Sequence, residues 1–63
     1  MFTMIQVVER SPESFSEAVK KAVTAMIEAG RKVHFFEVIE QRGAVRDGAF
    51  KEFQVKLNVA VES

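Results

Sequence analysis

Two residues of this chain, Phe35 and Gln54, have the chemistry to hold a flat heteroaromatic ligand. A phenyl ring offers a stacking surface, and a glutamine amide offers a donor and an acceptor to the edge of a pyrimidine-like ring. Both residues lie in extended segments of alternating polarity. The same side chains also suit packing between subunits, so the residues by themselves leave a ligand site and a subunit contact both open.

No residue pattern indicates catalysis. His34 has no partner at a metal-ligand or general-base spacing, and a histidine at a surface or interface explains it more simply. The chain has no cysteine, and its carboxylates are scattered rather than grouped as in a cation-binding loop. The serines stand at helix-start or terminal positions, where capping or exposure accounts for them: Ser11, Ser14, Ser16 and Ser63. We therefore expect neither an enzyme nor a metal site.

Composition predicts one small folded domain over residues 1–63. Apolar residues make up 48% of the chain, with three glycines and one proline, which favours a folded protein over a disordered one. Nine basic residues balance nine acidic ones, so no overall charge attracts nucleic acid or an anionic membrane. Residues 1–5 lack a basic leader and no apolar run is long enough to span a bilayer, so a cytoplasmic location is expected.

Local signals predict a β-α-β-β order. Residues 2–9 are rich in β-favouring types and end at Ser11-Pro12. An apolar stripe at helical spacing then predicts a helix over 14–29, starting either at Ser11-Pro12 or, preferably, at Ser14 with Glu17 as a capping box. Gly30 is the expected C-terminal stop.

The segment 33–61 reads as a hairpin that turns at Asp47-Gly48, the strongest short-range hairpin signal. The odd positions 53–61 are apolar and are expected to face the helix. A two-residue turn places Phe36 opposite Val59 and Val38 opposite Leu57 on that face. On the other face it pairs Phe35 with Ala60, Glu37 with Asn58, Ile39 with Lys56 and Gln41 with Gln54. A bulge near Arg42-Gly43 would exchange the faces beyond it.

The expected hairpin is longer than the expected helix can cover. Arms of about 13 residues reach about 40 Å, whereas a helix of about 16 residues spans about 24 Å. A chain of 63 residues buries little surface by itself. We therefore expect other copies of the same chain to cover the remainder.

Several segments resemble the dodecin family in order and spacing. They are Phe35-Phe36-Glu37-Val38, Arg42-Gly43, Asp47-Gly48 and Phe53-Gln54-Val55-Lys56-Leu57-Asn58-Val59, together with Ser11-Pro12-Glu13-Ser14-Phe15 at the helix start. The resemblance implies an α+β fold in which a three-stranded antiparallel sheet wraps around one helix, assembled into a hollow homododecamer. It also implies riboflavin or FMN bound at subunit interfaces for storage or sequestration, without catalysis.

The resemblance assigns Phe35 to the position of the family's stacking tryptophan and Gln54 to its flavin-contacting glutamine. Arg42 matches the arginine of the family's Arg-Gly pair, near the ligand's phosphate or at a subunit contact. Phenylalanine in place of tryptophan removes stacking area and an electron-rich ring. Two hypotheses follow: a flavin-binding cage, or a tryptophan-less shell that binds another small molecule or an ion, or serves as a structural assembly.

Overall fold

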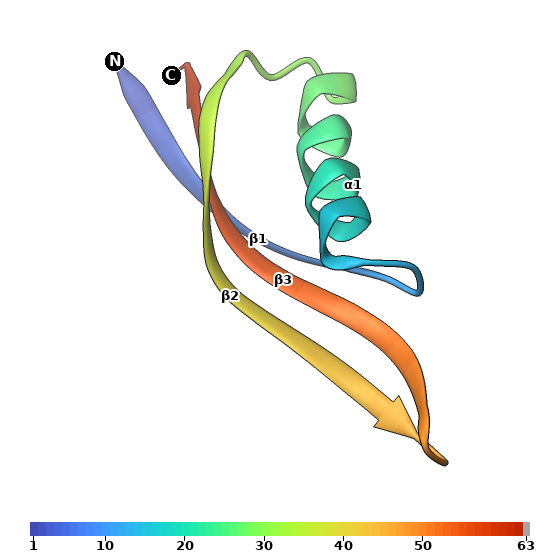
Figure 1. Cartoon of the computed structure of the whole chain (residues 1–63). Coiled ribbons are helices and arrows are strands. Elements are labelled where there is room, and N and C mark those ends of the chain that lie inside the picture. The colour runs from blue at the N-terminus through green and yellow to red at the C-terminus, as the bar shows by residue number, and fades with distance from the viewer. Residues whose placement is uncertain (63) are drawn as a thin grey trace.

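The computed structural model describes residues 1–62 as four elements in the order β1 (Phe2–Ser11), α1 (Phe15–Glu28), β2 (Val33–Arg46) and β3 (Ala49–Glu62). The strands form one antiparallel sheet in the order β1-β3-β2, so the last strand of the chain lies in the middle (Figure 1). This arrangement confirms the predicted α+β fold class and the predicted β-α-β-β order.

Both ends of α1 follow the predicted capping chemistry. The Ser14 Oγ accepts a hydrogen bond from the Glu17 N–H at 3.0 Å, which confirms the preferred start. The alternative start at Ser11 is wrong, because Ser11 ends β1. At the other end Gly30, with φ of 87°, donates to the Ile27 carbonyl, and Arg31 donates to the Met26 carbonyl. These two bonds form a Schellman motif.

The hairpin turn is also as predicted. Asp47 and Gly48 both have positive φ, 52° and 77°, as a type I′ turn requires. Beyond the turn, the structure confirms the predicted pairs on both faces of the sheet: Phe36–Val59, Val38–Leu57, Phe35–Ala60 and Glu37–Asn58.

The predicted pairs Ile39–Lys56 and Gln41–Gln54 are wrong. Glu40 lies opposite Lys56, Arg42 lies opposite Gln54, and Gln41 lies opposite Val55. The register shifts between Ala44 and Val45 and shifts back between Val38 and Glu40, so the two irregularities cancel. Neither falls at the expected Arg42-Gly43.

The core lies between α1 and the sheet. Ala18 and Ala22 of α1 are buried, and their small side chains allow the helix to approach the sheet closely. The sheet contributes alternate residues of β3, all fully or almost fully buried: Val55, Leu57, Val59 and Val61. Their spacing of two confirms that the odd positions of β3 face the helix.

The fold is elongated, because α1 covers only part of the hairpin. The chain measures 46 × 20 × 12 Å. Its radius of gyration is 12.8 Å, against about 10.6 Å for a compact domain of this length. At the hairpin end, which extends past α1 in Figure 1, Val45 is 66% exposed and Phe50 opposite it is 77% exposed. No helix within residues 1–62 has the length and apolarity needed to cross a membrane.

We predict that Gly48→Ala lowers the free energy of unfolding by about 1 kcal/mol, because Gly48 holds a left-handed conformation that a Cβ disfavours. An added Cβ would meet no atom within 4 Å, so backbone strain is the only cost. Urea denaturation at fixed protein concentration measures the change.

Gly43→Ala is the matched control. Its φ is not positive, and its new Cβ would make an ordinary contact at 3.8 Å with the Glu52 carbonyl. Equal destabilisation by the two substitutions would contradict the assigned role of the Gly48 conformation.

Candidate functional site

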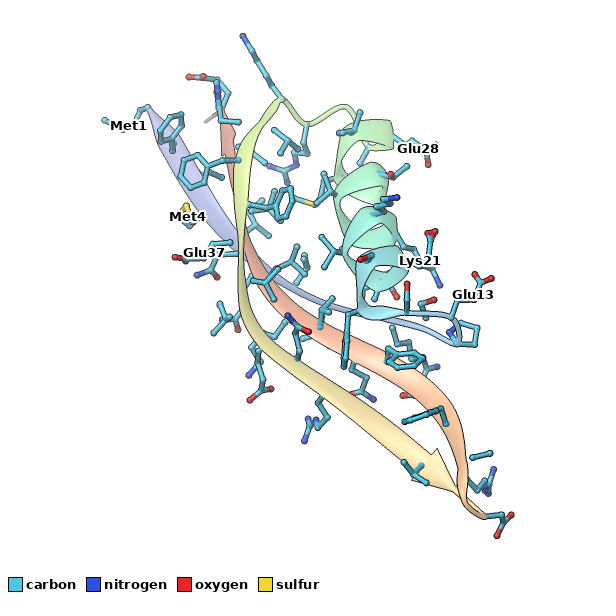
Figure 2. All side chains as sticks on the ribbon, viewed as in Figure 1. Met1, Met4, Glu13, Lys21, Glu28 and Glu37 are labelled. Atoms are coloured by element: carbon cyan, nitrogen blue, oxygen red, sulfur yellow. The ribbon has the colours of Figure 1, made fainter. Side chains whose placement is uncertain are left out.

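The sheet face opposite α1, here called the open face, carries both residues predicted to contact a ligand. The odd residues of β3 face the helix, so the even residues point to the open face. Gln54 is one of these, and Phe35 lies opposite another, Ala60. In Figure 2, Met4 and Glu37 extend on this side of the sheet.

One end of the open face is aromatic. The Phe35 ring meets the Phe2 ring of β1 edge-on, with centroids 5.5 Å apart and planes at 89°. The Phe2 ring also lies 4.7 Å from the His34 ring, at 52°. His34 is an extra residue in β2, between the pairs Val33–Val61 and Phe35–Ala60. Ala60 is fully buried although no helix of the described chain covers this face.

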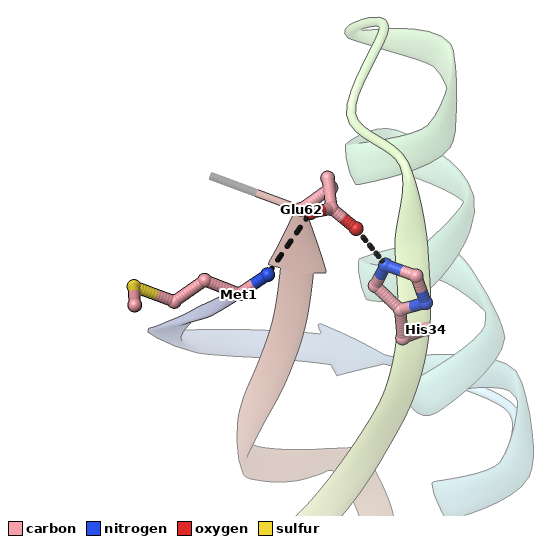
Figure 3. A network of polar contacts seen from close by, with 3 residues as sticks. All are labelled: Met1, His34 and Glu62. Atoms are coloured by element: carbon pink, nitrogen blue, oxygen red, sulfur yellow. Dashed lines mark hydrogen bonds and ion pairs between the residues drawn. The ribbon is translucent and has the colours of Figure 1, made fainter.

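A polar network borders this aromatic end (Figure 3). The Glu62 carboxylate lies 2.7 Å from the His34 Nε2 and 3.2 Å from the amino group of Met1. The hydrogen bond from His34, followed by that from the amino terminus, lowers the pKa of Glu62 below its ordinary 4.5. The carboxylate therefore stays charged and can hold both partners at neutral pH.

The other end of the open face is polar. Gln54 lies between Arg10 of β1 and Arg42 of β2 in one row across the sheet. The Gln54 Nε2 donates to the Glu52 Oε2 at 2.6 Å, and the Arg10 Nη1 lies 3.8 Å from the Glu52 Oε1. Glu52 thus contacts both the amide and one of the two guanidinium groups.

Sequence reasoning predicted Arg42 and Gln54 as site residues but did not predict Arg10 and Phe2. Both missed residues lie at even positions of β1, which alternate with the core-facing Ile5 and Val7. That alternation in the sequence predicts which face of the sheet each residue of β1 occupies. It does not predict the neighbouring residue, because Arg10 lies opposite Gln54 only through the pairing of β1 with β3.

Within one chain the structure brings Arg42 and Gln54 together but keeps Phe35 apart from them. Phe35 lies opposite Ala60, six residues from Gln54 along β3, which corresponds to about 20 Å of strand. Between the two ends lie an exposed contact of 3.5 Å from Asn58 to Glu37 and an ion pair of 4.0 Å from Lys56 to Glu40. A small flat ligand cannot contact Phe35 and Gln54 of the same chain.

The hollows on the helix side involve none of the three predicted ligand residues. One lies between α1 and β2 and is lined by apolar side chains including Phe15, Phe36 and Val38, with Gln41 at its edge. A larger, open hollow lies between α1 and the end of β1 and is lined mainly by polar and charged residues. Among residues 1–62 no group of three or more His, Cys, Asp or Glu side chains is arranged to hold a metal ion.

Comparison with known proteins defines the protein family to which this chain belongs. The family model described as Dodecin matches residues 1–62, and the chain belongs to the dodecin family. Dodecins are generally non-enzymatic flavin-binding proteins that assemble into oligomers. No curated protein sequence gives a match.

Solved structures agree with this assignment. The chain is 35% identical to dodecin from Streptomyces coelicolor, with a TM-score of 0.89, covering 100% of this chain and 94% of that one. It is 31% identical to a T. thermophilus dodecin in which a tryptophan is replaced by phenylalanine, with a TM-score of 0.88 and coverage of 97% and 91%. A calcium dodecin from Mycobacterium tuberculosis is 25% identical, with a TM-score of 0.86 and coverage of 100% and 90%.

We predict that Glu62→Gln lowers the thermal stability at neutral pH and that this difference disappears in acid. The lowered pKa means that the carboxylate stabilises the folded state above its ordinary pKa of 4.5. That contribution is lost as the pH falls through the lower folded-state value. Melting temperatures of both proteins, measured from about pH 3 to about pH 7, test this. A difference that persists unchanged at the acid end would contradict the assignment.

Proposed function

We propose that this protein binds riboflavin or FMN without turning it over, and stores or sequesters it at the subunit interfaces of a cytoplasmic homododecamer. Family membership supports a flavin as the ligand. The observation that carries the proposal is the open face, which presents an exposed aromatic ring at one end and an amide flanked by two arginines at the other.

The separation of these two ends favours a site shared by two copies. A ligand stacked on Phe35 of one copy can meet Gln54 only from another copy, because the two lie about 20 Å apart along one strand. Phe35 supplies the stacking surface and Gln54 supplies hydrogen bonds to the ring edge. Arg42, which lies opposite Gln54, suits the phosphate of FMN, because a guanidinium binds phosphate through paired N–H groups.

Exposed apolar side chains support the assembly. Within residues 1–62, ten large hydrophobic residues are exposed, on both faces of the sheet, on α1 and at the hairpin end. They are Met1, Phe2, Met4, Val8, Ile27, Phe35, Phe36, Ile39, Val45 and Phe50. Monomeric soluble proteins rarely expose so much apolar surface together, so burial against sibling chains is the favoured explanation.

A second candidate is a shell that does not bind flavin. It is favoured by the phenyl ring at the position of the family's tryptophan, which offers less stacking area, and by the calcium dodecin among the structural relatives. In this case the ligand is an ion or another aromatic molecule, or the assembly itself is the function.

Fluorescence titration of riboflavin and FMN with the purified protein distinguishes the two candidates. We expect Phe35→Trp to tighten flavin binding by about tenfold, because each site uses two copies of the ring and an aromatic pair contributes roughly 0.5 to 1.5 kcal/mol beyond burial. Phe50→Trp, at an exposed phenylalanine near the hairpin turn, is the control. Once sedimentation confirms that it keeps the mass of the parent assembly, it should leave the affinity unchanged. Binding by Phe35→Trp but not by the parent, at tens of micromolar flavin, would favour the second candidate.

Sedimentation equilibrium tests the assembly independently of the ligand. We expect twelve copies of the 7.1 kDa chain, a mass of about 85 kDa, to persist at micromolar concentration. A folded monomer under these conditions would contradict both candidates, since each requires the uncovered hairpin to be buried.

A further inference from the structure

The aromatic end of the open face is built from two rings that meet at a right angle. Phe35 comes from β2 and Phe2 from the start of β1, and their planes are inclined at 89°. Phe35 is 47% exposed and Phe2 is 53% exposed, so both rings keep surface that a ligand can contact. A flat ligand that stacks on one of these rings lies perpendicular to the other ring and can meet it edge-to-face. Edge-to-face contact is a favourable aromatic geometry.

The position of Phe2 is fixed from its other side. The His34 ring lies 4.7 Å from the Phe2 ring, and the His34 Nε2 lies 2.7 Å from the Glu62 Oε1. His34 is also the residue that the irregularity adds to β2 just before Phe35. Glu62 is in turn the direct pairing partner of Phe2 in the sheet. Backbone pairing and side-chain contacts thus hold Phe2 at the same place.

We propose that Phe2 is a second wall of the ligand site, which contacts the edge of the flat heteroaromatic ligand stacked on Phe35 and limits its position and size. His34 is a positioning residue that keeps Phe2 against Phe35. This inference rests on the proposed function for the identity of the ligand. The second ring compensates in part for the smaller stacking area of phenylalanine relative to tryptophan.

The test compares riboflavin affinity in Phe2→Leu and in Phe50→Leu. Leucine keeps apolar volume and removes the ring, so Phe2→Leu should weaken binding by about fivefold or more. Phe50→Leu removes another exposed ring, which stacks on Phe53 at the far end of the hairpin. Once sedimentation confirms that this variant keeps the mass of the parent assembly, it should leave the affinity unchanged. Phe2→Tyr keeps the ring and should retain the parent affinity within about twofold. If the parent binds riboflavin and Phe2→Leu binds it equally well, the inference is overturned and the proposed function stands.

If the parent does not bind riboflavin, the proposed function fails and the inference is decided in the Phe35→Trp background. The chain has no tryptophan of its own, so quenching of this single reporter measures binding directly. If adding Phe2→Leu to Phe35→Trp weakens riboflavin binding, the result supports Phe2 as a second wall of the site. Equal binding, or no binding in that background, overturns it.

If sedimentation shows that Phe2→Leu has lost the parent's assembly mass, affinity cannot report on the Phe2 ring alone. Nuclear Overhauser contacts are then measured instead. The contacts measured are those between the Phe2 ring and bound riboflavin. The protein used is the parent if it binds riboflavin, and otherwise Phe35→Trp. A contact supports the inference, and none overturns it.

Discussion

The difference in rise per residue between helix and strand shapes this molecule. The helix α1 and the strand β3 each contain 14 residues, yet a strand rises about 3.3 Å per residue and a helix about 1.5 Å. One helix therefore covers less than half of the hairpin. Apolar side chains such as Phe50 remain exposed beyond it. A single core can stabilise only the part of the sheet that the helix reaches, so the remaining surface is available for sibling chains.

The central strand β3 organises both faces of the sheet. It pairs with β1 without irregularity over ten residues, so its strict alternation sends Leu57 and its odd neighbours to the helix. The even residues go to the open face, where they separate an aromatic end at Ala60 from a polar end at Gln54. Since the two ends lie too far apart for one small ligand, ligand binding and assembly are coupled in the proposed function. A ligand bound between copies would stabilise the assembly by mass action.

In the proposed site, Phe35 offers a smaller stacking ring than the tryptophan of the family pattern. The structural relative with the same kind of replacement, from T. thermophilus, shares the fold at a TM-score of 0.88. In that relative, phenylalanine in place of tryptophan is thus compatible with the dodecin fold. In this chain the neighbouring Phe2 supplies a second ring, held by His34 and Glu62. The chemistry of the aromatic end depends on this group rather than on Phe35 alone.

Local sequence determined the elements and their ends. The capping box at Ser14, the stop at Gly30 and the turn at Asp47-Gly48 follow from conformational preferences of single residues, and the alternation in β3 follows from burial of one face. These signals act over a few residues, so sequence reasoning could identify them. They also sufficed to put Phe35 and Gln54 on one face, because the two register irregularities between the turn and Phe35 cancel.

Only the tertiary structure decided which distant residues become neighbours. The position of β1 beside β3 brings Arg10 to Gln54 and Phe2 to Phe35, and neither contact has a local signal. The irregularities on either side of Arg42 likewise decide that Arg42, and not Gln41, shares the face of Gln54. Where a strand takes up an extra residue depends on packing across the whole sheet, which no short stretch of sequence specifies.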